Sequence, residues 1–268
     1  MAAARLHFVT GKGGVGKSTV CAALALAAAQ RGARVLAVEL SAPGGLSGLF
    51  GVRPAVAGVP VRVRDDVWLS FIDGGDALSE YLGRVLRPRR LREAVLAHAL
   101  YRTFVTVAPG VGALMTMGKI RDELRQRDGF RRRHDVLVVD AGASGHALSY
   151  LRMHSAAKLT FTGRGLVRRE IDNIDRLLRD AESTAIHVVA LPEDMPLCEA
   201  QTVVERLADE PALPIGALLV NRRLNVGPAD ADVAIEQLAA LADAPPARDA
   251  LLATLRWRRA RELREEQA

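Results

Sequence analysis

Residues 11–18 form a glycine-rich segment, G-K-G-G-V-G-K-S, that carries the clearest chemistry in the chain. The segment fits the pattern G-x-x-x-x-G-K-[ST], follows an apolar run and precedes an alanine-rich run that predicts a helix. Backbone N–H groups of such a loop surround phosphate oxygens, its lysine contacts the β- and γ-phosphates, and its hydroxyl ligates Mg²⁺. The predicted phosphate-binding residues are Gly13, Gly14, Val15, Gly16, Lys17, Ser18 and Thr19.

The segment 135–140, D-V-L-V-V-D, is an apolar run that ends in an acidic residue. A buried strand of this kind presents its last carboxylate, here Asp140, beside a phosphate-binding loop, where it can hold Mg²⁺ through water. Ser18 and Asp140 are therefore the predicted metal-binding residues. The loop and the acidic strand together predict a site for ATP or ADP with Mg²⁺.

Strands and helices must alternate to bring these segments together. Short apolar runs do alternate with longer amphipathic runs, which is typical of parallel βαβ units in a doubly wound α/β fold. Some runs are apolar throughout, as expected when helices cover both faces of a mostly parallel sheet. The predicted strands are 5–10, 34–39, 67–72, 135–140, 158–162, 186–191 and 215–221. The predicted helices are 17–31, 78–106, 111–127, 166–182, 197–208, 229–242 and 247–265.

A single P-loop NTPase domain over residues 1–268 is the predicted organisation, because the chain has no internal repeat or low-complexity linker. The stretch 74–133 delays the next predicted core strand. It is far longer than the roughly 12 residues that a βα crossover needs, and its periodicity is helical. We therefore expect a helical insertion subdomain over 74–133 within the nucleotide-binding fold.

Composition and charge exclude several classes of protein. The 268 residues are 49% hydrophobic and 25% charged, which excludes disordered and collagen-like chains. The net charge of +6 comes from arginines scattered along a sequence with 4% aromatic residues, so no nucleic acid partner is expected. No uncharged run reaches the ~18 residues of a membrane span. Cys21 and Cys198 form no C-x-x-C zinc motif or disulfide framework. We expect a soluble, cytoplasmic protein.

Two motifs resemble one family of ATPases. Residues 12–18 follow K-G-G-x-G-K-[ST], the deviant Walker A motif of ATPases that dimerise face to face around nucleotide. Residues 140–148, D-A-G-A-S-G-H-A-L, closely resemble the switch II sequence D-[TA]-[AP]-P-[TS]-G-H-[TA]-L of the ArsA and guided-entry ATPases, with glycine and alanine at the usual proline positions. Residues 191–200 and 218–221 resemble two further segments of that family. The chain most resembles the bacterial paired forms that lack C-x-x-C.

The resemblance implies roles for four further residues. Lys12 would reach across a dimer to the partner's nucleotide and neutralise charge that develops in phosphoryl transfer; the alternative is a solvated loop cation. Gly145 would let switch II follow the γ-phosphate, and His146 would couple that loop to the next helix unless it is merely structural. Asn221 would contact the adenine edge unless it is only a turn former. The implied partner is a second copy of the chain or a homologous ATPase subunit.

Switch I departs from the family pattern D-P-A-H-[SN]-L-S-D-x-F. Aligning L-S-x-x-F with residues 46–50 places Ser41 where the family has its catalytic aspartate, and Glu39 lies two residues earlier. A serine cannot act as a general base at neutral pH, so weak hydrolysis is expected in the isolated subunit. Glu39 or a partner could supply the missing carboxylate, or it is absent. Lys12, Lys17, Glu39 and Ser41 are the candidate catalytic residues.

Several functions remain open at this stage. The resemblance favours a nucleotide-gated dimeric ATPase whose helical insertion binds an apolar client or a membrane-associated partner. The alternatives are a non-hydrolysing scaffold subunit of a heterodimer, an anion-pump ATPase, disfavoured because a cysteine cluster for arsenite is missing, and a DNA-partition ATPase, disfavoured by the Ser-Gly-His switch. Apolar residues in the insertion either bind a client or form its core; they are Leu96, Leu100, Phe104, Val107, Leu114, Met115, Met117 and Ile120.

Overall fold

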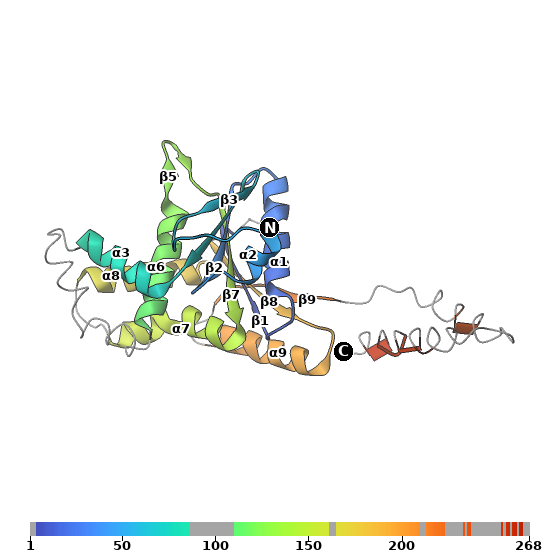
Figure 1. Cartoon of the computed structure of the whole chain (residues 1–268). Coiled ribbons are helices and arrows are strands. Elements are labelled where there is room, and N and C mark those ends of the chain that lie inside the picture. The colour runs from blue at the N-terminus through green and yellow to red at the C-terminus, as the bar shows by residue number, and fades with distance from the viewer. Residues whose placement is uncertain are drawn as a thin grey trace.

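A seven-stranded sheet forms the centre of the protein, in the order β3-β4-β2-β7-β1-β8-β9 (Figure 1). This computed structural model describes residues 4–85, 110–160, 165–209 and 213–222, together with isolated positions from 233 onward. All neighbouring strands are parallel except the pair β3 and β4, which is antiparallel. The strands are β1 (Leu6–Gly11), β2 (Val35–Leu40), β3 (Val61–Arg64), β4 (Val67–Ile72), β7 (Val136–Ala143), β8 (Thr184–Ala190) and β9 (Ile215–Val220).

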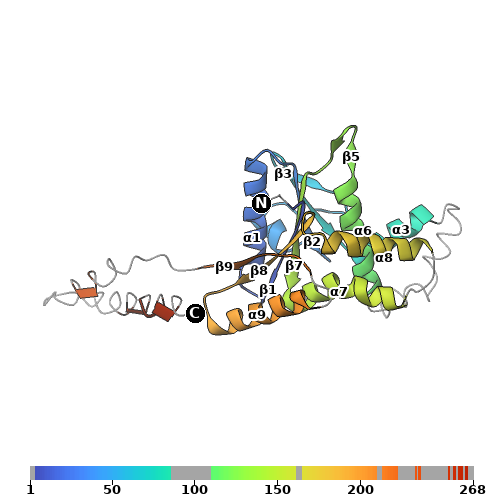
Figure 2. The same ribbon diagram turned by 180° about the vertical axis from the view of Figure 1, so that it is seen from behind.

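Helices cover both faces of the sheet, as the two opposite views show (Figures 1 and 2). One face packs against α1 (Lys17–Gln30) and α2 (Gly45–Phe50). The other face packs against a larger set of helices and a bigger apolar cluster. These helices are α6 (Val111–Arg125), α7 (Ser144–Thr160), α8 (Leu166–Arg179) and α9 (Asp194–Ala208), with α3 (Gly74–Val85) packed on α6. The doubly wound α/β fold expected from the sequence is therefore confirmed.

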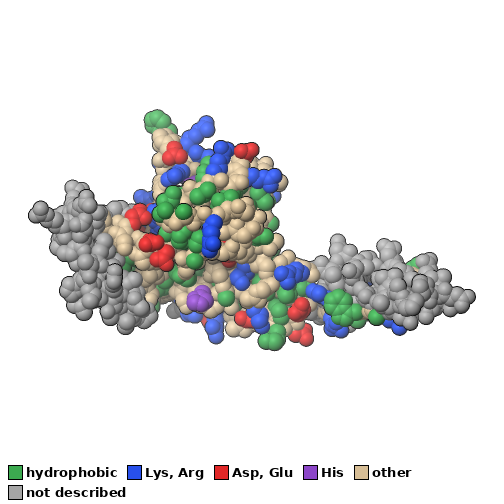
Figure 3. All heavy atoms as spheres, viewed as in Figure 1, with side chains coloured by type: hydrophobic (Ala, Val, Ile, Leu, Met, Phe, Trp, Pro, Cys, Tyr) green, Lys and Arg blue, Asp and Glu red, His purple; other side chains and the backbone are tan. Residues whose placement is uncertain are grey.

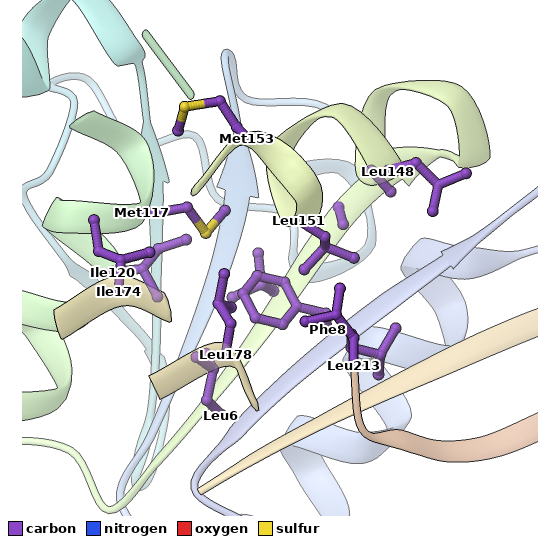
Figure 4. Close-up of a cluster of buried hydrophobic side chains, with 14 of the residues drawn as sticks. Leu6, Phe8, Met117, Ile120, Leu148, Leu151, Met153, Ile174, Leu178 and Leu213 are labelled. Atoms are coloured by element: carbon purple, nitrogen blue, oxygen red, sulfur yellow. The ribbon is translucent and has the colours of Figure 1, made fainter. Parts of the chain in front are cut away.

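Alternation along β1 divides the apolar core between the two faces. Leu6 and Phe8 are fully buried on the face covered by α6 to α9, whereas Val9 is buried on the α1 face. Figure 4 shows Phe8 among side chains from α6, α7 and α8, including Ile120, Leu151 and Leu178. Because both faces of the central strands are buried, their sequences are mostly apolar.

The sequence prediction was wrong about the segment 158–162. Residues 158–160 belong to α7, which continues from Ser144 to Thr160, and 161–164 lie outside the described residues. Buried positions at 147, 151, 154 and 157 follow the spacing of one helix face, which overrides the β propensity of the run L-T-F-T. The seventh strand is instead β3, which a tight turn at Asp65 and Asp66 pairs antiparallel with β4. Asp66 has a φ of +57° there.

The described part of the stretch 74–133 contains two helices, α3 and α6. Helix α6 confirms the helix predicted for 111–127 as far as Arg125, and it is followed by a small hairpin of β5 (Arg127–Asp128) and β6 (Arg131–Arg132). Helix α3 begins at 74, and the remainder of the helix predicted for 78–106 lies outside the described residues. The candidate client residues Leu96, Leu100, Phe104 and Val107 also lie outside them.

Helix α6 contributes to the main core of the protein. Leu114, Met115, Met117 and Ile120 are buried in the cluster that contains β1 and β7. Of the two alternatives, a client-binding surface or a core, the structure supports the core for these four residues, because their side chains pack in the main apolar cluster. Most of the helices predicted at 229–242 and 247–265 falls outside the described residues.

Candidate functional site

A cavity of about 490 Å³ lies at the carboxyl ends of β2 and β7, next to the loop that follows β1. Open α/β sheets bind ligands at this edge, where successive loops converge. The cavity joins the predicted phosphate loop, switch I and switch II. Its lining residues are Lys17, Ser18, Glu39, Leu40, Ser41, Ala42, Gly44, Gly45, Asp140, Ala141, Gly142, Ala143, His146 and Tyr150.

The phosphate loop turns through two glycines with left-handed backbones, Gly14 at φ +82° and Gly16 at φ +91°. No side chain caps the N-terminus of α1, so its first N–H groups remain free for an anion. The Lys17 ammonium donates a hydrogen bond to the backbone oxygen of Lys12 at 2.7 Å, across the loop. Burial lowers the pKa of Lys17, while the Asp140 carboxylate opposes that shift. The loop therefore has the shape and charge to surround phosphates.

Ser18 and Asp140 come together as predicted. The Ser18 hydroxyl donates to Asp140 Oδ2 at 2.5 Å, and Asp140 Oδ1 accepts a hydrogen bond from the Gly142 N–H at 3.3 Å. A hydroxyl and a carboxylate are hard oxygen donors, which Mg²⁺ prefers, and Mg²⁺ usually keeps several waters as its other ligands. The donor set therefore fits Mg²⁺. Thr19 follows on an exposed position of α1.

Glu39 is buried at the end of β2 and holds the switch I loop. Its side chain is 4% exposed, and Oε1 accepts hydrogen bonds from the N–H groups of Gly44 at 2.9 Å and Leu46 at 2.8 Å. Oε2 accepts from the Ser47 N–H at 3.3 Å and from the Ser47 hydroxyl. Both carboxylate oxygens are thus occupied by the loop 44–47. These contacts favour Glu39 as a residue that positions the switch I loop.

The same loop closes over Ser18. A Cβ added to Gly45 would lie 2.2 Å from Ser18 Oγ, so only glycine fits at this approach. Ser41 lies at the open side of the cavity, with a left-handed backbone at φ +72° and its N–H bonded to the Ile72 oxygen at 2.9 Å. Its hydroxyl lies 3.3 Å from the Tyr150 hydroxyl. Ser41 therefore lines the cavity next to Tyr150.

Switch II runs from β7 directly into α7. Gly142 has a φ of +74° and is the position that needs glycine in this turn. Gly145, expected in the loop, instead lies in the first turn of α7. His146 and Tyr150, one helical turn apart, both line the cavity from α7. Sequence reasoning missed Tyr150, and the signal that would reveal it is the i, i+4 spacing from His146 on a helix that was not predicted.

Lys12 is held by an ion pair within its own chain. Its ammonium lies 3.2 Å from Glu199 Oε2, and the Ser144 hydroxyl donates to Glu199 Oε1 at 3.3 Å. Glu199, on α9, therefore connects the phosphate loop to the start of switch II. The Lys12 side chain remains 31% exposed. Glu199 lies in the segment 191–200 that resembles the family, and its contact with Lys12 depends on the tertiary fold.

Asn221 directly follows β9 and contacts the phosphate loop. Its side-chain amide donates to the Val15 oxygen at 2.8 Å, and its N–H donates to the Ala190 oxygen at 2.8 Å. A Cβ on Gly16 would lie 2.3 Å from that amide nitrogen. Asn221 thus supports the loop backbone, and its contact with adenine remains a prediction.

Two further features concern metals and membranes. Cys21 is buried and Cys198 is exposed, and both thiols are free. Burial raises the pKa of Cys21 well above its usual value, which keeps it a neutral thiol. Within the described residues, no cluster of three or more His, Cys, Asp or Glu side chains is arranged to hold a metal ion. No helix in that part of the chain is long and apolar enough to span a membrane.

Sequence comparison agrees with this site. The chain is 34% identical over 225 residues to the ATPase BagA of Mycobacterium tuberculosis, a match that covers 82% of this chain and 65% of that relative. It is 24% identical over 256 residues to putative arsenical pump-driving ATPase 2 of Aquifex aeolicus, covering 84% and 82%. It is 22% identical over 232 residues to ATPase GET3 of Mycosarcoma maydis, covering 75% and 67%. The chain thus spans just under two thirds of the length of the mycobacterial relative.

The region that matches a family model contains the phosphate loop and both switches. A sequence model of the family described as "Anion-transporting ATPase" matches residues 4–166, which include Lys17, Ser18 and Asp140. That range extends from the start of β1 to the start of α8 and covers more than half of the chain. The chain therefore belongs to the anion-transporting ATPase family, ArsA.

Proposed function

We propose that the chain binds Mg·ATP in the 490 Å³ cavity and acts as a nucleotide-gated ATPase. The observation that carries the proposal is the convergence of Lys17, Ser18 and Asp140 beside an uncapped helix N-terminus. Bound Mg²⁺ would neutralise charge on the β- and γ-phosphates. Lys17 would leave the Lys12 oxygen for the phosphates, and the backbone N–H groups of 13–18 would orient them.

We further propose that hydrolysis is weak in the isolated chain. In-line attack on the γ-phosphate requires an oriented water, and Ser41 carries no carboxylate to accept its proton. Glu39 does not replace the missing group, because the loop 44–47 occupies both of its oxygens. A non-hydrolysing subunit paired with an active homologue is the second candidate, and Ser41 is the observation that favours it.

The proposed active form is a dimer, of two identical chains or with a homologous subunit. Lys12 would contact the partner's nucleotide, so its pair with Glu199 would have to break. That pair is partly exposed and is the kind of contact that costs little to exchange. The proposed client is apolar or membrane-associated. Transport of an anion is less favoured, because within the described residues no thiol cluster exists for arsenite.

Nucleotide binding and single-turnover hydrolysis test this function. Calorimetry with Mg·ATP should show binding that Lys17→Ala abolishes, while Arg31→Ala, at the other end of α1, serves as a matched control. Hydrolysis should be slow in the isolated chain and faster when a paired homologue is added. Undiminished affinity in the Lys17 variant would contradict the assignment of the site.

A further inference from the structure

The β5–β6 hairpin presents a phenylalanine to solvent. Its turn contains Gly129, at φ +63°, and Phe130, whose side chain is 100% exposed. The hairpin, labelled β5, projects from the body of the protein at the top of Figures 1 and 2. Exposure of an aromatic ring to water is unfavourable, because burial of a side chain of this size contributes favourable free energy through the hydrophobic effect. Nothing within the described residues covers it.

The tip is held in a defined geometry. The Arg127 guanidinium donates to the Phe130 backbone oxygen at 3.2 Å, which closes the turn. At the base, Arg133 donates to Gln126 through both its side chain, at 2.8 Å, and its backbone N–H, at 2.9 Å. The next residue, His134, is buried against the edge of Trp68. The ring is therefore exposed by an ordered hairpin rather than by a frayed chain end.

Positive charge surrounds this ring. Arg127, Arg131 and Arg132 are exposed, and Asp128 is the one acidic residue of the hairpin. In the described part of the chain, neither Arg131 nor Arg132 makes an ion pair with a carboxylate. Figure 3 shows basic side chains gathered around the projecting end, with hydrophobic atoms at its tip. The hairpin therefore presents one apolar side chain, Phe130, surrounded by basic side chains.

The basic surface continues beside the hairpin. A cavity of about 290 Å³ is lined by four arginines, Arg5 just before β1, Arg121 and Arg125 from α6, and Arg176 from α8. Among the described residues, Arg121 is the one of these four with a carboxylate partner, Glu170 at 2.7 Å. The arginines thus exceed the local acidic groups over both the hairpin and this cavity.

We propose that the β5–β6 hairpin docks on an anionic phospholipid surface. Phe130 would enter the boundary between headgroups and acyl chains, and the surrounding arginines would contact lipid phosphates. A convex tip with one ring fits a soft planar surface, whereas single-stranded nucleic acid is bound by grooves that carry several stacking aromatics. The hairpin precedes the amino end of β7 and the nucleotide cavity lies at its carboxyl end, so docking leaves the cavity accessible.

Vesicle flotation without nucleotide tests the proposal, using phosphatidylcholine vesicles with and without about one third phosphatidylserine. The wild-type chain should float with the anionic vesicles, and less so at higher salt. Phe130→Ala should weaken this binding by on the order of ten-fold or more, and Arg131→Glu by on the order of ten-fold. Met195→Ala and Arg206→Glu on α9 are matched controls, because both residues are exposed on the opposite side of the molecule (Figure 1).

A second variant reports on the ring itself. In Phe130→Trp, the indole fluorescence should shift to the blue on addition of anionic vesicles, whereas Met195→Trp should not respond. All these variants should keep the wild-type melting temperature, because the changed side chains are exposed. Equal vesicle binding by Phe130→Ala and the wild type, or equal binding to both kinds of vesicle, would overturn the proposal. So would tight binding of DNA that is lost in the hairpin variants while vesicle binding is absent.

Discussion

Replacement of Glu39 by glutamine separates the two roles that this carboxylate can have. If Glu39 orients the attacking water, Glu39→Gln removes the base and leaves the fold intact. If it holds the switch I loop, as the structure indicates, the same change weakens the loop. The carboxylate accepts hydrogen bonds from Gly44, Leu46 and Ser47 at both oxygens. A glutamine keeps one acceptor oxygen and turns an NH₂ donor toward backbone donors.

The expected loss of stability follows from these contacts. A hydrogen bond to a charged acceptor contributes about 1.5–3 kcal/mol, and a buried donor left without an acceptor costs about 1–3 kcal/mol. Because one oxygen survives, we expect Glu39→Gln to lower the free energy of unfolding by about 2–4 kcal/mol in total. For a chain of this size, that corresponds to a melting temperature lower by roughly 5–10 °C. Affinity for Mg·ATP should fall as well, because the loop covers Ser18.

Thermal unfolding, calorimetry of Mg·ATP and single-turnover hydrolysis are measured on the same samples. Ser47→Ala is the matched variant, because it removes the hydroxyl donor and keeps the carboxylate; its loss should be about 1 kcal/mol. The double variant should lose less than the sum of the single losses, since the two residues share a contact. An unchanged melting temperature with hydrolysis reduced a thousand-fold would refute the loop-holding role and identify Glu39 as the base.

Further predictions concern the other site residues and the buried histidines. Lys12→Ala should bind nucleotide normally yet lose ATP-dependent dimerisation, and an unchanged mass shift in sedimentation would contradict this. Glu199→Gln should favour the dimer at lower ATP concentrations, because it releases Lys12. Ser41→Asp should raise single-turnover hydrolysis by on the order of ten-fold or more, with general-base contributions of ~10²–10⁴ as the ceiling; a fast wild-type rate that the substitution leaves unchanged would disprove it. Burial lowers the pKa of His134 and of His187 from 6.5 to about 4, so the unfolded chain binds more protons between these values. The melting temperature should therefore fall as the pH is lowered from 6.5 toward 4, and His187→Asn should reduce that slope.

Local sequence was sufficient for the phosphate loop and the central strands. The residues 11–18 act through backbone N–H groups and a helix start, which depend on glycine spacing and on neighbours in the chain. The strands predicted at 67–72 and 135–140 are buried over most of their length, so a largely apolar run predicts them. The proximity of Ser18 and Asp140 was predictable as well, because parallel strands bring their carboxyl ends to one edge.

Contacts between distant segments could not be predicted in the same way. The prediction for 158–162 failed because burial against the sheet, rather than local propensity, keeps α7 helical to Thr160. Because α7 was not predicted from the sequence, Tyr150 was not predicted as a residue of the cavity. From the sequence, Glu39 could be either a general base or a residue that positions the loop. The hydrogen bonds that its oxygens accept from the loop 44–47 favour the second role. The position of the Lys12 ammonium likewise depends on its ion pair with Glu199, which lies far along the chain on α9. A side chain's type states which bonds it can make, but the available partners depend on packing, and packing is a property of the folded chain.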